Sequence, residues 1–113
     1  MHEYGIAYDI VETARRAALE NKARLIGKVC VDIGELSMIN PEQVTFLFHT
    51  MIEDDPLFAG AELVCTLRSP VTSCICGYRG DEIYVCPDCG ALPVIESGKE
   101  IVVTNIEIEA DEE

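Results

Sequence analysis

Four cysteines lie close together in the second half of the chain, in two short motifs that each end in glycine. Cys74 and Cys76 form a C-x-C pair, and Cys86 and Cys89 form a C-x-x-C pair after nine intervening residues. A zinc ion takes about four soft ligands at roughly 2.3 Å, and a tight turn can present two sulfurs to one ion. The spacing therefore favours a metal site over disulfides or buried apolar thiols.

The amino terminus offers a second set of metal ligands. The bulky second residue, His2, predicts that Met1 is retained, which leaves a free amine beside an imidazole and the carboxylate of Glu3. The amine, the His2 amide nitrogen and the His2 ring can form fused chelate rings, and such nitrogen-rich sets favour Ni(II) or Cu(II). The alternative is an exposed and mobile terminal histidine. His49, the only other histidine, is expected at the surface or at the edge of the core.

Charge and composition narrow the possible partners. The chain of 113 residues has 8 basic and 21 acidic side chains, a net charge of −13. Phosphate contacts need clustered Lys and Arg, so nucleic acid is not an expected partner, whereas cations and basic protein surfaces are. No secretory signal and no apolar stretch of about 18 residues is recognisable, which predicts a cytoplasmic protein with reduced thiols and no membrane partner. No catalytic triad, Cys-His pair or phosphate-binding loop is recognisable, so no enzymatic activity is expected.

Two amphipathic helices are predicted in the first half of the chain. Apolar residues recur at helical spacing from Tyr4 to about Asn21. A second helix begins at Pro41, with Asn40 as its cap and Gln43 at the position of a capping-box partner. Its apolar stripe ends before the Asp-Asp-Pro sequence at residues 54–56.

Three strands are predicted from alternating patterns. The first covers residues 25–36, the second follows Gly60, and the third covers residues 99–109 with Val102 and Thr104 on the face of Ile106 and Ile108. The simplest arrangement has the third strand rejoin the first sheet. We therefore predict an α+β fold with a small three-stranded sheet, two helices and an inserted zinc-ribbon-like metal module. The expected domains are residues 1–68 with 99–113, and the inserted residues 69–98.

These features together resemble the HypA/HybF family of hydrogenase/urease nickel-insertion accessory proteins. The resemblance runs over nearly the whole chain, and the opening tripeptide combined with G-E-L-S and two cysteine pairs is a specific combination. The matching segments are residues 1–3, 33–37, 41–42, 60–63, the two cysteine pairs and residues 106–108.

The resemblance implies a nickel metallochaperone that delivers Ni(II) to the large subunit of [NiFe]-hydrogenase, and in some bacteria serves urease. It implies a GTPase partner of the HypB type, and a homodimer is possible. Its nickel ligands would be the Met1 amine, His2 and Glu3. The inserted domain would hold a structural zinc.

The first cysteine pair departs from the C-x-x-C-G pattern of the family. Ser73 stands where the first thiol would be, and the thiol is at Cys74. C-x-C can chelate zinc through a more constrained ring, so the expected ligands are Cys74, Cys76, Cys86 and Cys89, with Cys65 a less favoured substitute for the fourth. Two other interpretations are a zinc-ribbon interaction module without nickel and a rubredoxin-like iron electron carrier.

Overall fold

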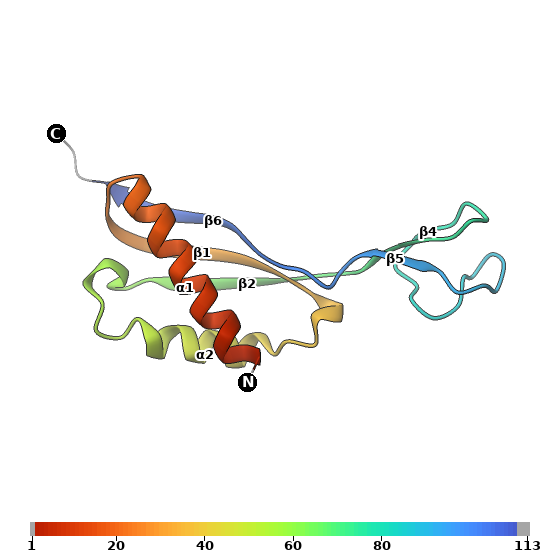
Figure 1. Cartoon of the computed structure of the whole chain (residues 1–113), viewed down its shortest axis with the longest axis horizontal. Helices are drawn as coiled ribbons and strands as arrows, with labels where there is room; N and C mark the ends of the chain where they lie inside the picture. Colours follow the sequence, from red (N-terminus) through yellow and green to blue (C-terminus); the bar gives the residue numbers. More distant parts are fainter. Residues whose placement is uncertain (1, 111–113) are drawn as a thin grey trace.

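The computed structural model describes residues 2–110, which form two small β-sheets joined end to end (Figure 1). The larger sheet carries both helices, and the smaller one carries the cysteine motifs. The elements of the larger part are α1 (His2–Glu20), β1 (Ala23–Gly34), η1 (Glu35–Ser37), α2 (Pro41–Met51), η2 (Pro56–Phe58), β2 (Glu62–Arg68) and β6 (Ile101–Ala110). The elements of the smaller part are β3 (Val71–Ser73), β4 (Arg79–Gly80) and β5 (Val94–Ser97).

The larger sheet has the strand order β2-β1-β6. β1 pairs with β2 in parallel and with β6 in antiparallel orientation. A parallel pair needs a crossover connection, and α2 lies within it. The last strand thus rejoins the first sheet after the smaller sheet is complete, as the sequence pattern predicted.

One core connects the helices to one face of this sheet. Alternate residues of β1, such as Val29, Val31 and Ile33, are fully buried, whereas Cys30 and Asp32 between them are partly exposed. The helices contribute their apolar stripes, with Phe48 and the small residues Ala7, Ala14 and Ala18 completely buried. Alanine at these positions lets α1 approach the sheet closely.

The predicted cap of α2 is confirmed, but the capping box is not. The Asn40 Oδ1 atom accepts hydrogen bonds from the N–H groups of Glu42 (2.9 Å) and Gln43 (3.3 Å). The N–H of Asn40 itself donates to Oε2 of Glu3 at 3.4 Å, rather than to the Gln43 side chain. Glu3, in the first turn of α1, therefore accepts the hydrogen bond that a capping-box side chain would accept at the start of α2.

The face predicted for the first part of β6 is wrong. Ile101 and Val103 pack against the core, as Ile106 and Ile108 do, while Val102 is 51% exposed. The pairing changes register between Cys30 and Val31 of β1, where β6 holds one extra residue. The extra residue shifts the alternation of the two strand faces by one position. Ile101 and Val103 before it and Ile106 and Ile108 after it therefore point to the same face.

The two sheets meet at a junction of closely packed backbone. The N–H of Leu36 donates to the carbonyl of Gly98 at 2.8 Å, and the N–H of Gly34 donates to the carbonyl of Glu100 at 2.8 Å. Gly98 has φ +124°, and a Cβ there would lie 2.7 Å from the Cα of Pro70. A Cβ on Gly34 would overlap the Gly98 carbonyl. Only glycine fits at both positions.

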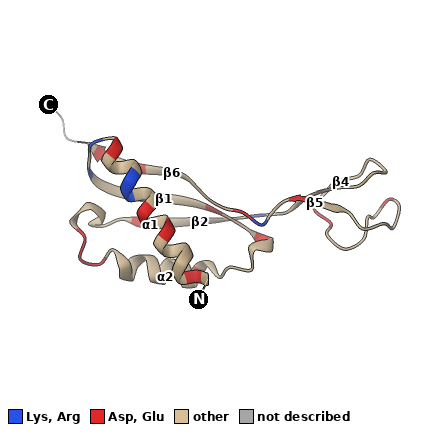
Figure 2. Cartoon of the chain, viewed as in Figure 1, with Lys and Arg blue, Asp and Glu red and all other residues tan. Residues whose placement is uncertain are grey.

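The molecule is elongated because the smaller sheet projects away from the helices (Figures 1 and 2). Its extents are 60 × 32 × 16 Å and its radius of gyration is 17.8 Å. A compact chain of this length would have a radius of gyration of about 13 Å. Within the described residues, no helix has the length and apolar character needed to cross a membrane.

Candidate metal centre

The two cysteine motifs form facing turns at the end of the smaller sheet. In the first, the N–H of Gly77 donates to the carbonyl of Cys74, a turn of four residues. In the second, the N–H of Gly90 donates to the carbonyl of Cys86, a turn of five residues. Both glycines have positive φ, +104° and +80°. The C-x-C motif thus presents its thiols from a turn that is one residue tighter than that of the C-x-x-C motif.

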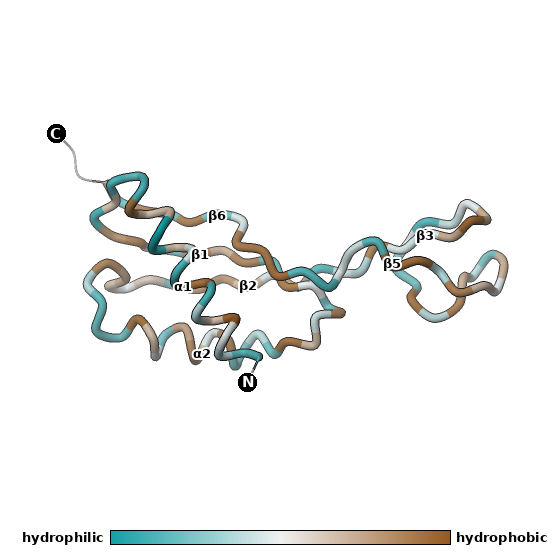
Figure 3. The backbone as a smooth tube through the Cα atoms, in the orientation of Figure 1, coloured by the Kyte–Doolittle hydropathy of each residue, from teal (hydrophilic) through white to brown (hydrophobic). Residues whose placement is uncertain are grey.

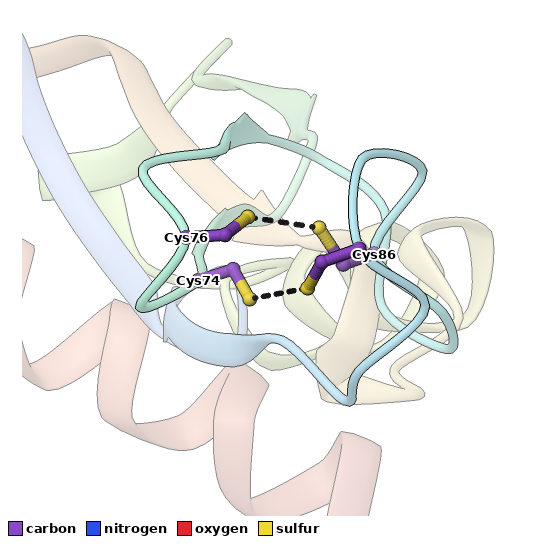
Figure 4. A group of neighbouring side chains, drawn as sticks. Cys74, Cys76 and Cys86 are labelled. Atoms are coloured by element: carbon purple, nitrogen blue, oxygen red, sulfur yellow. Dashed lines mark hydrogen bonds between the residues drawn. The ribbon is translucent and has the colours of Figure 1, made fainter.

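These turns bring the four thiols together. The sulfurs of Cys74 and Cys89 lie 3.5 Å apart, and those of Cys76 and Cys86 lie 3.6 Å apart (Figure 4). All four sulfurs lie within 4.8 Å of one another. Tetrahedral thiolates at 2.3 Å from a zinc ion would be about 3.8 Å apart. The spacing and the donor set therefore fit a tetrahedral metal ion.

The thiols lie within hydrogen-bonding distance of one another in two pairs, Cys74 with Cys89 and Cys76 with Cys86. Desolvation raises the pKa of Cys86, but the N–H groups of Asp88 and Cys89 and the Cys76 thiol outweigh it and lower this pKa to about 7. The N–H of Tyr78 lowers the pKa of Cys76, but the neighbouring thiols and desolvation together raise it to about 12. The first thiolate of the cluster therefore forms readily, whereas the formation of a second thiolate is opposed. A divalent cation removes that opposition because it favours the charged form of every ligand.

Ser73, which replaces the first thiol of the family pattern, points to a different partner. Its hydroxyl donates to Oε2 of Glu96 at 2.5 Å, and Arg79 reaches the same carboxylate with Nη1 at 3.3 Å from Oε1. The Ser73 hydroxyl and, less strongly, the Arg79 charge hold the pKa of Glu96 below its usual value. This network joins all three strands of the smaller sheet. Sequence reasoning missed Glu96, because nothing in its local sequence marks it.

The remaining cysteines lie in the larger sheet, away from this cluster. Cys65 is packed against the core, with its sulfur 3.8 Å from the Thr45 hydroxyl. Burial raises the pKa of the Cys65 thiol, and the Thr45 contact offsets part of that effect. Cys30 lies on β1, between its partners Val64 and Asn105. Neither cysteine belongs to the group of four converging sulfurs.

The amino-terminal candidates begin the first helix. His2 is exposed in the first turn of α1, and Glu3 is half-buried and accepts the hydrogen bond from Asn40. Met1, whose amine completes the proposed chelate, lies outside the described residues. The first N–H groups of a helix have no acceptor within it, so the His2 amide is not committed to the helix. The fold therefore places both residues in the first turn of α1.

His49 does not join either site. It is exposed near the end of α2, and its ring lies edge-on to Phe48 with centroids 5.4 Å apart. Sequence reasoning placed it at the surface or the edge of the core, and that is confirmed. Among residues 2–110, only the four cysteines form a group of three or more potential metal ligands.

Comparison with known proteins gives a consistent result over nearly the whole chain. A family model described as hydrogenase/urease nickel incorporation, metallochaperone, HypA matches residues 1–108. The hydrogenase maturation factor HypA of Methanocella arvoryzae is 38% identical over 113 residues, covering 96% of this chain and 99% of that protein. The protein of the same name from Methanococcus aeolicus is 38% identical over 124 residues, covering 99% and 100%.

Solved structures agree with the fold. The solution structure of the Ni metallochaperone HypA from Helicobacter pylori superimposes with a TM-score of 0.73 at 23% identity, covering 96% of this chain and 98% of that one. A second solution structure, of HypA protein, gives a TM-score of 0.75 at 25% identity and covers 98% of each chain. The arrangement of a helix-bearing sheet with a projecting smaller sheet is thus shared with these proteins.

Proposed function

The chain belongs to the HypA family of hydrogenase/urease nickel-incorporation metallochaperones, and from this premise we propose that it binds Ni(II) with its first residues and releases it by ligand exchange. It is a hydrogenase maturation factor and not an enzyme. The observation that carries the proposal is the start of α1 at His2, which leaves an imidazole, a free amide and the Glu3 carboxylate in one helical turn. With the Met1 amine they form the nickel-binding set.

The position of these nickel ligands suits a metal ion that must be released to a recipient protein. The amino-terminal end of a helix carries a partial positive charge, which opposes a bound cation. His2 is exposed, so a recipient can approach and substitute its own ligands one at a time. Glu3 offsets part of the unfavourable dipole with its carboxylate, and it is already held near the helix start by Asn40.

The cysteine cluster has a different role in this proposal. Cys74, Cys76, Cys86 and Cys89 hold a structural zinc, because four thiolates in a closed set leave no position for a substrate. The metal supplies the folding free energy that residues 69–98 cannot obtain from a core of their own. We propose these residues as an inserted domain, and residues 1–68 with 99–113 as the nickel-binding domain.

The pathway partners follow from the family. A hydrogenase maturation factor acts with other maturation proteins. We propose a GTPase of the HypB type and the [NiFe]-hydrogenase large subunit as those partners, in the cytoplasm. Urease is a second possible recipient because the family description includes it.

Metal analysis of the untagged protein tests the nickel site. His2→Ala should abolish specific nickel binding in calorimetric titration while the zinc content and the circular dichroism spectrum stay unchanged. His49→Ala is the matched control, since it removes the other exposed imidazole, and it should bind nickel normally. Retained nickel stoichiometry in His2→Ala would contradict the terminal site.

A second experiment tests the contribution of the amine. A tag fused directly before Met1 converts the amine into an amide, which is a much weaker ligand. Nickel affinity should fall, and proteolytic removal of the tag should restore it. A colourless protein with zinc and no iron would separate the zinc assignment from a rubredoxin-like site.

A further inference from the structure

A groove lies between α1 and β6, on the side of the core next to the junction. Its volume is about 310 Å³, and its wall on the helix consists of Ile6, Asp9, Ile10 and Thr13. Residues 101–103 of β6 form the opposite wall. The lining is thus mainly aliphatic, with one carboxylate and one hydroxyl. This size and lining suit one or two apolar side chains of a ligand.

The strand that borders the groove is an unprotected sheet edge. β6 is hydrogen-bonded to β1 on one side only. Its first six residues, 101–106, read Ile-Val-Val-Thr-Asn-Ile, without a charge or a proline. Figure 3 shows the corresponding hydrophobic run of the backbone between the β6 label and the junction. Natural proteins usually protect edges with charges, prolines or a covering element, and an edge without them is a template for another strand.

The bulge in β6 limits where such a strand can pair. The register changes after Val103, so the ladder that borders the groove is regular along residues 101–103 and is interrupted at Thr104. This short segment is also the wall of the groove. An added strand would therefore present alternate side chains to the groove while its backbone pairs with β6.

The charge of the groove indicates the chemistry of the occupant. Asp9 is exposed, and no described residue forms an ion pair or a hydrogen bond with its carboxylate. Lys99, which lies two residues before β6, does not line the groove. A second copy of this chain would bring another net charge of −13 against it. Charge complementarity thus favours a basic partner over self-association.

We propose that the groove between α1 and β6 is a docking site for an extended segment of a partner protein, in which apolar residues alternate with Lys or Arg. The segment adds to β6 as a fourth strand, its apolar side chains enter the groove against Ile6 and Ile10, and a basic side chain meets Asp9. Ile6 lies one turn beyond His2 on α1. A docked segment therefore stands beside the amino terminus, but its binding does not require nickel.

The test uses a fluorescent hexapeptide of alternating valine and lysine as the probe, with the zinc-loaded full chain. Binding is measured by anisotropy, and its location by amide chemical shifts. We expect saturable binding with the largest shifts at residues 6–13 and 101–103. Peptides with glutamate in place of lysine, or with a central proline that cannot extend the ladder, should bind much more weakly.

Two charge reversals on the same helix provide matched variants. Asp9→Lys should weaken binding of the valine–lysine peptide about tenfold or more. Glu20→Lys makes the same change in net charge at an exposed position of α1 away from the groove, and it should bind the peptide nearly as well as the unaltered chain. His2→Ala should bind it normally even though nickel binding is lost, so failure of the nickel proposal would leave this result unchanged.

Three outcomes would overturn the docking site. The first is the absence of shifts at residues 6–13 and 101–103. The second is equal weakening by Asp9→Lys and Glu20→Lys, which would mean attraction to overall charge only. The third is a dimer in sedimentation analysis that excludes the peptide and dissociates with Asp9→Lys, because a second copy would then be the occupant.

Discussion

The hydroxyl of Ser73 is bonded to the carboxylate of Glu96 at 2.5 Å, and this contact joins β3 to β5 directly before the first cysteine motif. Arg79 on β4 adds its guanidinium to the same carboxylate. The residue that replaces a family thiol thus fixes the end of β3, directly before Cys74. The shorter turn of the C-x-C motif therefore begins next to Ser73, which is held by its hydrogen bond to Glu96.

Loss of this anchor should weaken metal binding without removing a ligand. Glu96→Ala leaves Ser73 and Arg79 without their common partner, so β3 is held less firmly. We expect the affinity for zinc or cobalt to fall several-fold in competition with a chromophoric chelator, at unchanged stoichiometry. Asp81→Ala, a charge removal in the same segment, is the control, and equal affinities in the two variants would contradict the anchoring role.

Metal removal should unfold one part of the chain. Cys89→Ser should lose zinc and expose the amides of residues 69–98 to rapid hydrogen exchange, because the metal stabilises that segment. The exchange of buried amides in β1 should change much less. Cys65→Ser is the control, since that thiol is packed against the larger core and should leave zinc in place. Uniform loss of protection throughout the chain would mean that the proposed domains fold as one unit.

The junction should not tolerate a methyl group at Gly98. Its φ of +124° is strained for alanine, and the new Cβ would meet the Cα of Pro70 at 2.7 Å. We expect Gly98→Ala to lower the free energy of unfolding by about 1–3 kcal/mol in urea titrations. Gly60→Ala also has positive φ, +76°, but open space around the Cβ, so it should cost about 1–2 kcal/mol from the backbone alone. A Gly98→Ala variant no less stable than Gly60→Ala would argue against the close approach.

Acid should loosen the same junction. The N–H of Gly98 donates to Oε1 of Glu100 at 3.0 Å, and this bond, with further backbone N–H groups, lowers the pKa of Glu100 from its usual 4.5. A depressed pKa in the folded state stabilises the fold above about pH 4.5. That contribution is lost as the pH falls below 4.5 through the lower folded value.

Hydrogen exchange at Gly98 measures this effect. After correction for the intrinsic exchange rate, protection of its amide should decrease below pH 4.5 in the unaltered chain. In Glu100→Gln the decrease should disappear, because the amide oxygen accepts the bond at every pH. The pKa of Glu96 is also lowered, so both measurements belong in a Glu96→Gln background. A pH profile identical with and without Glu100 would contradict the assignment.

Arg15 should stabilise the packing of α1 against the turn after α2. Its Nη1 lies 2.6 Å from Oδ2 of Asp55, and its guanidinium lies 5.4 Å from the centre of the Phe58 ring. Lysine cannot reproduce both contacts, so Arg15→Lys should cost about 1 kcal/mol in chemical denaturation. Arg16→Lys, at the next and exposed position, should be neutral. Equal stabilities of the Arg15→Lys and Arg16→Lys variants would show that the contacts of Arg15 with Asp55 and Phe58 contribute nothing to stability.

The sequence predicted those features that depend on nearby residues. The cap at Asn40, the two glycine-ended turns and the alternation of β1 are local, and each is confirmed. The face of β6 was mispredicted because its bulge arises from pairing with β1, which lies far away in the sequence. The bonds from Ser73 to Glu96 and from Asn40 to Glu3 span 23 and 37 residues. No local pattern predicts such contacts, so these features of the candidate sites required the structure.

Two chain segments connect the smaller sheet to the larger sheet. Residues 69–70 connect β2 to β3, residues 98–100 connect β5 to β6, and β2 and β6 are the two outer strands of the larger sheet. A single connection would allow the smaller sheet to rotate freely relative to the larger sheet. Two short tethers on opposite sides of β1 restrain rotation about the long axis and leave tilting as the softer motion. We therefore expect the end that carries the four cysteines to tilt toward or away from the helices more readily than it twists.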